Sequence, residues 1–336
     1  MGDILGRARG LVRTAALSAA TAAGAVAVVA RTTPWPSALV IRAVFDRGAA
    51  RSSAALARHV PGDLVEIVDE AYDIASPDGR LDVFRPRRDE PLLTVVWVHG
   101  GAFVSGSKSD VSNYLRVLAG RGLTTVGVDY SIAPGSRYPT PVKQVAAALA
   151  HVVDHADRLG VDPGRVVLAG DSAGAQIAAQ VALLVTDPAY AAEIGIDAPV
   201  PSSSLRGLVL FCGAYDFRLA RGTSRLGGWL VDTAIWSYLG SSRRHDERTT
   251  RQGTVPLHVS PSFPPSFVSA GNADPLLPHT LGLIEALEQH GVDRDVLLFE
   301  DAHLPRLGHE YQFDLDSADG REALDRAVAF VHRVAG

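Results

Sequence analysis

The sequence is poor in cysteine, and it has no excess of positive charge. Cys212 is its one cysteine, so an intrachain disulfide and a metal centre built on several thiolates are excluded. The 11 histidines show neither an HExxH pair nor a Cys/His spacing of the kind that zinc needs, so no metal site is expected. The 32 basic and 37 acidic residues give a formal net charge of -5, which provides no basic field for collecting phosphates. We therefore expect no nucleic-acid partner.

The composition is that of a folded globular protein. With 336 residues, 47% of them hydrophobic and 21% charged, the chain can bury a substantial core in one large or two modest domains. It contains no internal repeat and no low-complexity linker. Cys212 follows the apolar run 208–211, which predicts a buried, unreactive thiol at the end of a strand.

The N-terminal segment 1–31 is hydrophobic and stands apart from the rest of the chain. Residues 14–30 carry no charge and are flanked by Arg7, Arg9, Arg13 and Arg31. This pattern fits a helix packed on the protein, an uncleaved membrane anchor or a signal peptide, and the sequence leaves all three open. The membrane-anchor interpretation predicts membrane association through residues 14–30. A cytoplasmic or membrane-associated location is favoured over a secreted one.

From residue 63 onward, short strands alternate with helices. Segments 64–69 and 80–85 have half-buried strand patterns and are joined through a Ser-Pro-Asp-Gly turn, which predicts a hairpin. Six further runs are apolar on both faces, as a buried parallel sheet requires; they span 93–98, 123–128, 165–169, 208–211, 266–270 and 296–299. Helices are predicted near 110–120, 141–159, 173–185, 278–290 and 319–334. The alternation predicts an α/β fold with a mostly parallel central sheet covered by helices on both faces.

Two segments fall outside this alternation. Residues 38–58 have apolar side chains at helical spacing, which predicts a second helix, and residues 218–260 form a long insertion rich in aromatic side chains, which is interpreted as a helical cap over one end of the sheet. We therefore divide the chain into the hydrophobic segment 1–31 and an α/β domain over 32–336.

The first candidate catalytic residue is Ser172, in the Gly-Asp-Ser-Ala-Gly motif at 170–174. The motif follows the strand 166–169 and opens a helix rich in small residues, which is the setting of a nucleophile elbow. The sharp turn strains the backbone of the serine, so the residues two before and two after it must lack bulk. An ordinary tight turn is the competing interpretation.

A serine hydroxyl needs an imidazole to accept its proton and a carboxylate to orient that imidazole. In this architecture the acid and then the histidine follow the serine, each in a loop just beyond a strand. Asp274, after the strand 267–270, is favoured as the acid, with Asp216 as its competitor. His309, in the loop before the last helix, is favoured as the base, with His303 as its competitor.

An oxyanion hole is the third requirement of such a site. His-Gly-Gly-Ala-Phe at 99–103 comes directly after the strand 93–98, and its two glycines let backbone N–H groups approach a substrate oxygen closely. Together with the amide of Ala173, the amides of Gly100 and Gly101 are therefore candidate donors to the developing alkoxide. The glycine pair also fits a simple turn.

Five motifs, taken in order, resemble the signature of the hormone-sensitive-lipase-like branch of the α/β-hydrolases over residues 60–335. They are HGGAF at 99, DYSIAP at 129, GDSAG at 170, ADPLLP at 273 and HEYQF at 309. The last of these is longer than the common His-Gly-Phe of the family. The resemblance implies an α/β-hydrolase fold and a serine esterase or lipase that needs no cofactor. It implies a cap built from the N-terminal helices and the insertion, with cap elements at 32–60 and 217–260. It also implies that Ser172 is the nucleophile, Asp274 the acid and His309 the base, with Gly100, Gly101 and Ala173 as oxyanion donors.

The leading hypothesis is hydrolysis of small-molecule carboxylic esters with short to medium acyl chains, through an acyl-serine intermediate. An amide hydrolase of the arylformamidase type or an acyltransferase would use the same machinery. A ligand-binding receptor is the hypothesis from another class, since some relatives in the family have lost the histidine and bind a ligand under the cap. Both Ser172 and His309 are present here, which favours an enzyme.

Overall fold

A computed structural model describes residues 32–220, 224–240 and 247–336. The predictions for the segment 1–31, including the proposed membrane contact of residues 14–30, lie outside the described residues. Among the residues that it does describe, no single helix is long and apolar enough to cross a membrane. The consecutive helices Ser172–Thr186 and Pro188–Ile194 together reach the length and hydropathy of a membrane-spanning helix, but the chain bends by 117° between them.

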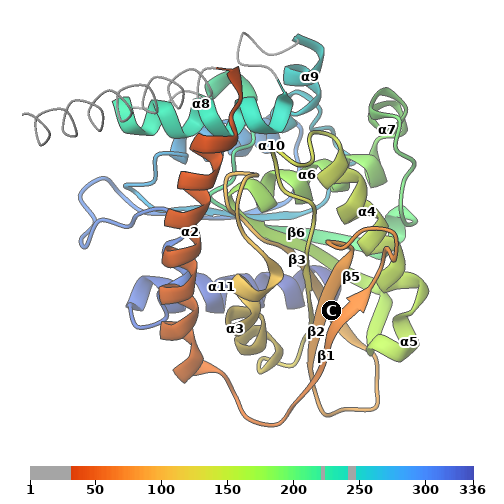
Figure 1. Cartoon of the computed structure of the whole chain (residues 1–336). Coiled ribbons are helices and arrows are strands. Elements are labelled where there is room, and N and C mark those ends of the chain that lie inside the picture. Colours follow the sequence, from red (N-terminus) through yellow and green to blue (C-terminus); the bar gives the residue numbers. More distant parts are fainter. Residues whose placement is uncertain (1–31, 221–223, 241–246) are drawn as a thin grey trace, which may run out of the picture.

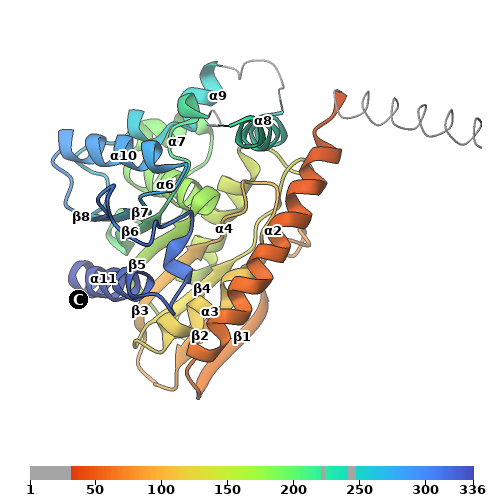
Figure 2. The same ribbon diagram turned by 90° about the vertical axis from the view of Figure 1, so that its left-hand side faces the viewer.

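An eight-stranded sheet forms the centre of the protein (Figures 1 and 2), in the order β1-β2-β4-β3-β5-β6-β7-β8. The strands are β1 Leu64–Ala71, β2 Arg80–Pro86, β3 Leu92–Val98, β4 Thr124–Val128, β5 Val161–Asp171, β6 Leu205–Phe211, β7 Ser266–Ala270 and β8 Arg294–Leu298. β1 and β2 pair antiparallel, as predicted, and β2 joins β4 antiparallel. From β4 to β8 every pair is parallel, so the carboxyl ends of these strands lie along one edge.

Helices cover both faces of the sheet, as the apolar strands require. Buried side chains of α3 (Lys108–Ala119) and α11 (Ala318–Ala335) join the core on one face. Those of α4 (Thr140–Asp154), α6 (Ser172–Thr186) and α10 (Leu277–Gln289) join the core on the other. The prediction of a mostly parallel sheet with helices on both sides is confirmed.

The structure differs from the sequence prediction in two helices. The single helix expected over 141–159 is broken at His155 into α4 and the short α5 (Ala156–Leu159). A short helix, α7 (Pro188–Ile194), was not predicted. The Asp187 side chain caps it by accepting hydrogen bonds from the Ala189 and Tyr190 amides, and Pro188 opens its first turn.

Two helices stand outside the sheet layers, α2 (Trp35–Leu56) and α8 (Arg225–Leu239) (Figures 1 and 2). α8 lies at the carboxyl edge of the strands, and α2 contacts α8 and then runs along α3. A third, α9 (Glu247–Gln252), follows α8 in the chain. α2 is tied to the body by Arg42, whose guanidinium donates to the carbonyl oxygens of Val104 at 2.8 Å and Ala133 at 3.2 Å. Ser105 adds a hydroxyl hydrogen bond of 2.6 Å to Asp46 on the same helix.

Candidate active site

Ser172 lies in a sharp turn between β5 and α6. Its φ of 52° is in the left-handed region, which a non-glycine residue adopts only when the surrounding structure imposes it. A side chain at Gly174 would collide with the carbonyl oxygen of Val98, and a Cβ at Gly170 would lie 2.7 Å from the Gly174 carbonyl carbon. The predicted elbow is therefore present, and the predicted need for small residues on either side of Ser172 is confirmed.

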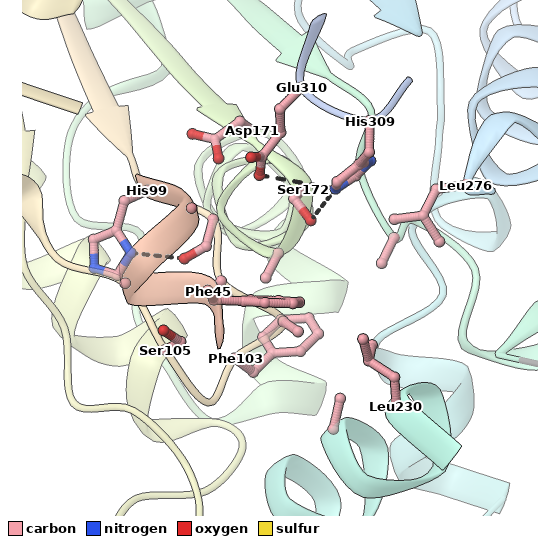
Figure 3. A pocket seen from close by; sticks show the side chains of 18 of the residues that line it. Phe45, His99, Phe103, Ser105, Asp171, Ser172, Leu230, Leu276, His309 and Glu310 are labelled. Carbon is pink, nitrogen blue, oxygen red and sulfur yellow. Dashed lines mark hydrogen bonds and ion pairs between the residues drawn. The ribbon is translucent and has the colours of Figure 1, made fainter. Parts of the chain in front are cut away.

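The structure brings Ser172, His309 and Asp274 together in one hydrogen-bonded chain. His309 Nε2 lies 2.9 Å from Ser172 Oγ, as Figure 3 shows. His309 Nδ1 lies 3.0 and 2.9 Å from the two carboxylate oxygens of Asp274. Asp274 follows β7, its side chain is fully buried, and its Oδ1 also accepts a 2.7 Å hydrogen bond from the Leu276 amide. Since Nδ1–H donates to the carboxylate, Nε2 is left as the acceptor for the serine proton.

The two competing residues lie elsewhere and have other partners. The Asp216 carboxylate forms an ion pair with Arg218, with Oδ2 at 2.7 Å from Nη2, and Oδ1 caps a short turn. His303 Nε2 lies 3.1 Å from Asp319 Oδ1, at the start of α11. Neither residue joins the chain of hydrogen bonds at Ser172, so the favoured pair, Asp274 and His309, is the one assembled.

The surroundings of His309 act on its proton affinity in opposite directions. Burial favours the neutral ring, but neighbouring groups, the carboxylates of Asp274 and Glu310 among them, outweigh it and raise the pKa of His309 well above its ordinary value. Cys212 is buried as predicted, and burial raises the pKa of its thiol to about 11, so the thiol is protonated at neutral pH. Its sulfur lies within 4.8 Å of the Asp274 and His309 side-chain atoms, a contact that the sequence did not reveal.

These three side chains also have the donor types of a metal site. Both nitrogens of His309 are already engaged, one by Ser172 and the other by Asp274. The arrangement is therefore that of a proton relay, in which the carboxylate fixes the ring and the ring faces the hydroxyl.

The loop after β3 approaches Ser172 from the other side. Gly101, Ala102 and Phe103 all have positive φ, of 111°, 52° and 63°, and the carbonyl oxygen of Gly101 accepts hydrogen bonds from the amides of Val104 and Ser105. This compact turn, together with Gly100 and Ala173, lines the same cavity as Ser172. The predicted oxyanion residues are therefore gathered around the serine.

His99 is a residue whose part in this loop the sequence analysis missed. Its ring is buried, stacks on Tyr130 at 4.3 Å between ring centroids, and donates from Nδ1 to the carbonyl oxygen of Gly100 at 2.8 Å. The Tyr130 hydroxyl donates to the His99 carbonyl oxygen at 2.9 Å. Burial lowers the pKa of His99 to about 4, so the ring is neutral and acts as a fixed donor that holds the loop.

A cavity of about 710 Å³ opens onto the serine. Figure 3 shows Phe45, Phe103 and Leu230 on its wall below Ser172 and His309. α2 supplies Val44, Phe45, Gly48, Ala49 and Ser52, and α8 supplies Gly227, Leu230, Val231, Ala234 and Ile235. The wall is mostly apolar and carries a small number of polar groups, which is typical of a small-molecule site.

Two carboxyl groups beside the serine were also missed, those of Asp171 and Glu310. Asp171 precedes the serine and is buried, and Glu310 follows the histidine. Burial, and then the charge of Glu310, raise the pKa of Asp171 well above its usual range. One signal in the sequence could have revealed Glu310: it follows His309 in the HEYQF motif, which is longer than the common His-Gly-Phe of the family.

Comparison with known proteins identifies the family of the chain. The family profile of the alpha/beta hydrolase fold matches residues 95–304. The chain belongs to this family, in its hormone-sensitive-lipase-like branch. The predicted fold and the predicted enzyme class, a serine hydrolase acting on esters, agree with this membership.

Three solved structures illustrate the likeness. Inhibitor-bound esterase B from Lactobacillus rhamnosis is 20% identical, with a TM-score of 0.77 over 89% of this chain and 96% of that one. A thermostable carboxylesterase cloned from a metagenomic library is 25% identical, with a TM-score of 0.69 over 90% and 98%. One of two fungal esterases from Rhizomucor miehei is 25% identical, with a TM-score of 0.66 over 88% and 91%.

Proposed function

We propose that the protein hydrolyses carboxylic esters of small molecules through an acyl-enzyme formed on Ser172. The observation that carries the proposal is the 2.9 Å contact between Ser172 Oγ and His309 Nε2, with Asp274 hydrogen-bonded to the other ring nitrogen. This is the arrangement that turns a serine hydroxyl into a nucleophile.

In the first half of the reaction, Ser172 Oγ attacks the ester carbonyl carbon while its proton moves to His309 Nε2. Asp274 holds the ring in the correct tautomer and stabilises the imidazolium that forms. The amides of Gly100, Gly101 and Ala173 donate to the developing oxyanion, which lies on the side of Ser172 away from His309. His309 then gives its proton to the leaving alcohol, and the acyl group stays on Ser172.

In the second half, a water molecule replaces the alcohol and the same groups work in reverse. His309 takes a proton from the water, whose oxygen attacks the acyl carbon, and then returns that proton to Ser172 as the C–Oγ bond breaks. The products are a carboxylic acid and the free enzyme. No metal or organic cofactor enters either step.

The substrate class follows from the cavity. Its volume of about 710 Å³ and its mostly apolar wall suit an acyl chain of short to medium length. α2 and α8 form that wall, and we assign them the role of a cap, in agreement with the cap elements 32–60 and 217–260. Membrane association through residues 14–30 stays a prediction from the sequence.

Replacement of the nucleophile tests this function. Ser172→Ala should reduce kcat on 4-nitrophenyl butanoate by ~10⁴-fold or more, because the remaining groups have nothing to activate. Ser202→Ala, at an exposed serine outside the cavity, is the matched control and should keep wild-type activity. Retained activity in Ser172→Ala would refute the proposal.

A further inference from the structure

Glu310 lies beside the reacting atoms, and the mechanism above gives it no task. Its Oε1 is 3.8 Å from His309 Nε2, its side chain is one-third exposed, and it lines the cavity (Figure 3). Its backbone has a φ of 60°, in the left-handed region that glycine adopts more easily. A charged side chain thus lies at the reaction centre, at a position whose backbone conformation would suit glycine better.

Asp171 fixes the position of the Glu310 carboxylate. The Asp171 side chain is buried, and its Oδ1 accepts a 2.7 Å hydrogen bond from Trp97 Nε1. A hydrogen bond joins the two carboxyl groups, and burial together with the charge of Glu310 raises the pKa of Asp171 well above its usual range. Gly100 leaves the necessary room, since a Cβ there would overlap Asp171 Oδ2 and lie 3.0 Å from Glu310 Oε1.

The distance between Glu310 and His309 suits a bridging water. At 3.8 Å, Oε1 and Nε2 are too far apart for a direct hydrogen bond, but one oxygen atom ~2.8 Å from each can bridge them. A water molecule has two O–H groups, so it can donate one to the Nε2 base and the other to the Glu310 carboxylate. An alcohol has one O–H group and cannot donate to both.

We propose that Glu310 binds the water that attacks the acyl-enzyme, and that it thereby favours hydrolysis over transfer of the acyl group to an alcohol. The inference rests on the proposed function. The water oxygen bonds to the acyl carbon, one proton passes to His309 Nε2, and the second stays on the oxygen, hydrogen-bonded to Glu310. The C–Oγ bond then breaks, His309 returns its proton to Ser172, and the carboxylic acid leaves. With an alcohol as nucleophile the same steps give an ester, without the contact to Glu310.

The test compares hydrolysis with alcoholysis in variants of Glu310. Glu310→Gly removes the carboxylate at a backbone that glycine accepts, and Glu310→Gln keeps the shape but loses the charge. Each enzyme is given 4-nitrophenyl butanoate with a fixed concentration of methanol, and butanoic acid and methyl butanoate are measured separately. The ratio of methyl ester to acid should rise about tenfold in Glu310→Gly, because a charge-assisted hydrogen bond to water is lost, and should rise less in Glu310→Gln.

Pre-steady-state kinetics separate this effect from general damage to the site. The burst of 4-nitrophenol reports acylation. Measured at a pH above the His309 pKa, where loss of the Glu310 charge leaves the ring neutral, the burst should keep its wild-type rate in both variants. The steady-state rate should fall, because hydrolysis of the acyl-enzyme is slowed. Asp301→Asn is the matched control, since it removes one acidic charge from the same loop at an exposed position outside the cavity, and it should leave the ratio unchanged.

The outcomes distinguish the two proposals. A wild-type product ratio in both Glu310→Gly and Glu310→Gln would overturn the role of Glu310 while leaving ester hydrolysis intact. If Glu310→Gly also loses the burst of 4-nitrophenol, its acylation is damaged, and the ratio of methyl ester to acid in Glu310→Gln alone decides the role of Glu310. A wild-type enzyme that neither releases 4-nitrophenol nor forms an acyl-enzyme would refute the proposed function, and the role of Glu310 with it.

Discussion

Gly100 offers a sensitive test of the oxyanion loop, because a single added methyl group changes its geometry. In Gly100→Ala the new Cβ would overlap Oδ2 of Asp171 and lie 3.1 Å from the carbonyl oxygen of the same residue. Asp171 has little room to yield, since it is 2% exposed and its Oδ1 is bonded to Trp97. The loop that carries Gly100 must therefore move away from Ser172.

Two magnitudes follow from this movement. A backbone donor withdrawn from the oxyanion lowers kcat by ~100- to 1000-fold. The overpacked methyl group lowers the free energy of unfolding by ~1–3 kcal/mol. At a temperature where the variant is still folded, the fall in kcat should therefore be much larger than the loss of stability alone would cause.

The assay is kcat and KM on 4-nitrophenyl butanoate, together with urea denaturation. Gly282→Ala is the matched control, because it makes the same change in α10 where no atom lies within 4 Å of the new Cβ. It should keep full activity and gain ~0.5–1 kcal/mol of stability, as alanine in a helix does over glycine. Wild-type kcat in Gly100→Ala would refute the assignment of this loop to the oxyanion.

Two further predictions concern the base and the pocket. His309 accepts a proton only when its ring is neutral, so kcat/KM should fall as the pH drops through the raised pKa of His309. In a plot of kcat/KM against pH, we expect the midpoint of this fall above pH 6.5. A midpoint at or below pH 6.5 would contradict the electrostatics described for His309. Leu230→Trp narrows the cavity, so a series of 4-nitrophenyl esters should show kcat/KM for the octanoate falling about tenfold relative to the acetate. Leu226→Trp, at an exposed position one turn earlier in the same helix and outside the cavity lining, should change neither value. An unaltered chain-length preference in Leu230→Trp would disprove the acyl pocket.

Most of the fold could be predicted from the sequence, because strands buried on both faces leave long apolar runs. All eight predicted strands are present, since hydrophobic periodicity reports burial directly. The break at His155 and the short helix α7 were missed because they depend on local capping, which contributes little to periodicity. Helix ends of this kind are decided by a few hydrogen bonds.

The site could be predicted only as far as its motifs extend. Ser172 was found from its setting between a strand and a helix, but the choice between Asp274 and Asp216 needed coordinates, since both follow a strand of the sheet. Asp171 and Glu310 were not singled out, because their effect depends on side chains that are distant in sequence meeting beside Gly100. Long-range contacts of this kind leave no local pattern in the chain.

The most direct test of the central claim is covalent labelling with an organophosphonate, followed by mass spectrometry of the labelled peptide. The phosphonate reacts with a serine that a neighbouring base has activated, so the wild-type protein should carry one adduct on Ser172 and lose its esterase activity in proportion. His309→Ala should label far more slowly, because the proton acceptor 2.9 Å from the hydroxyl is gone. An adduct on another residue with Ser172 unmodified, or equal labelling in His309→Ala, would contradict the account.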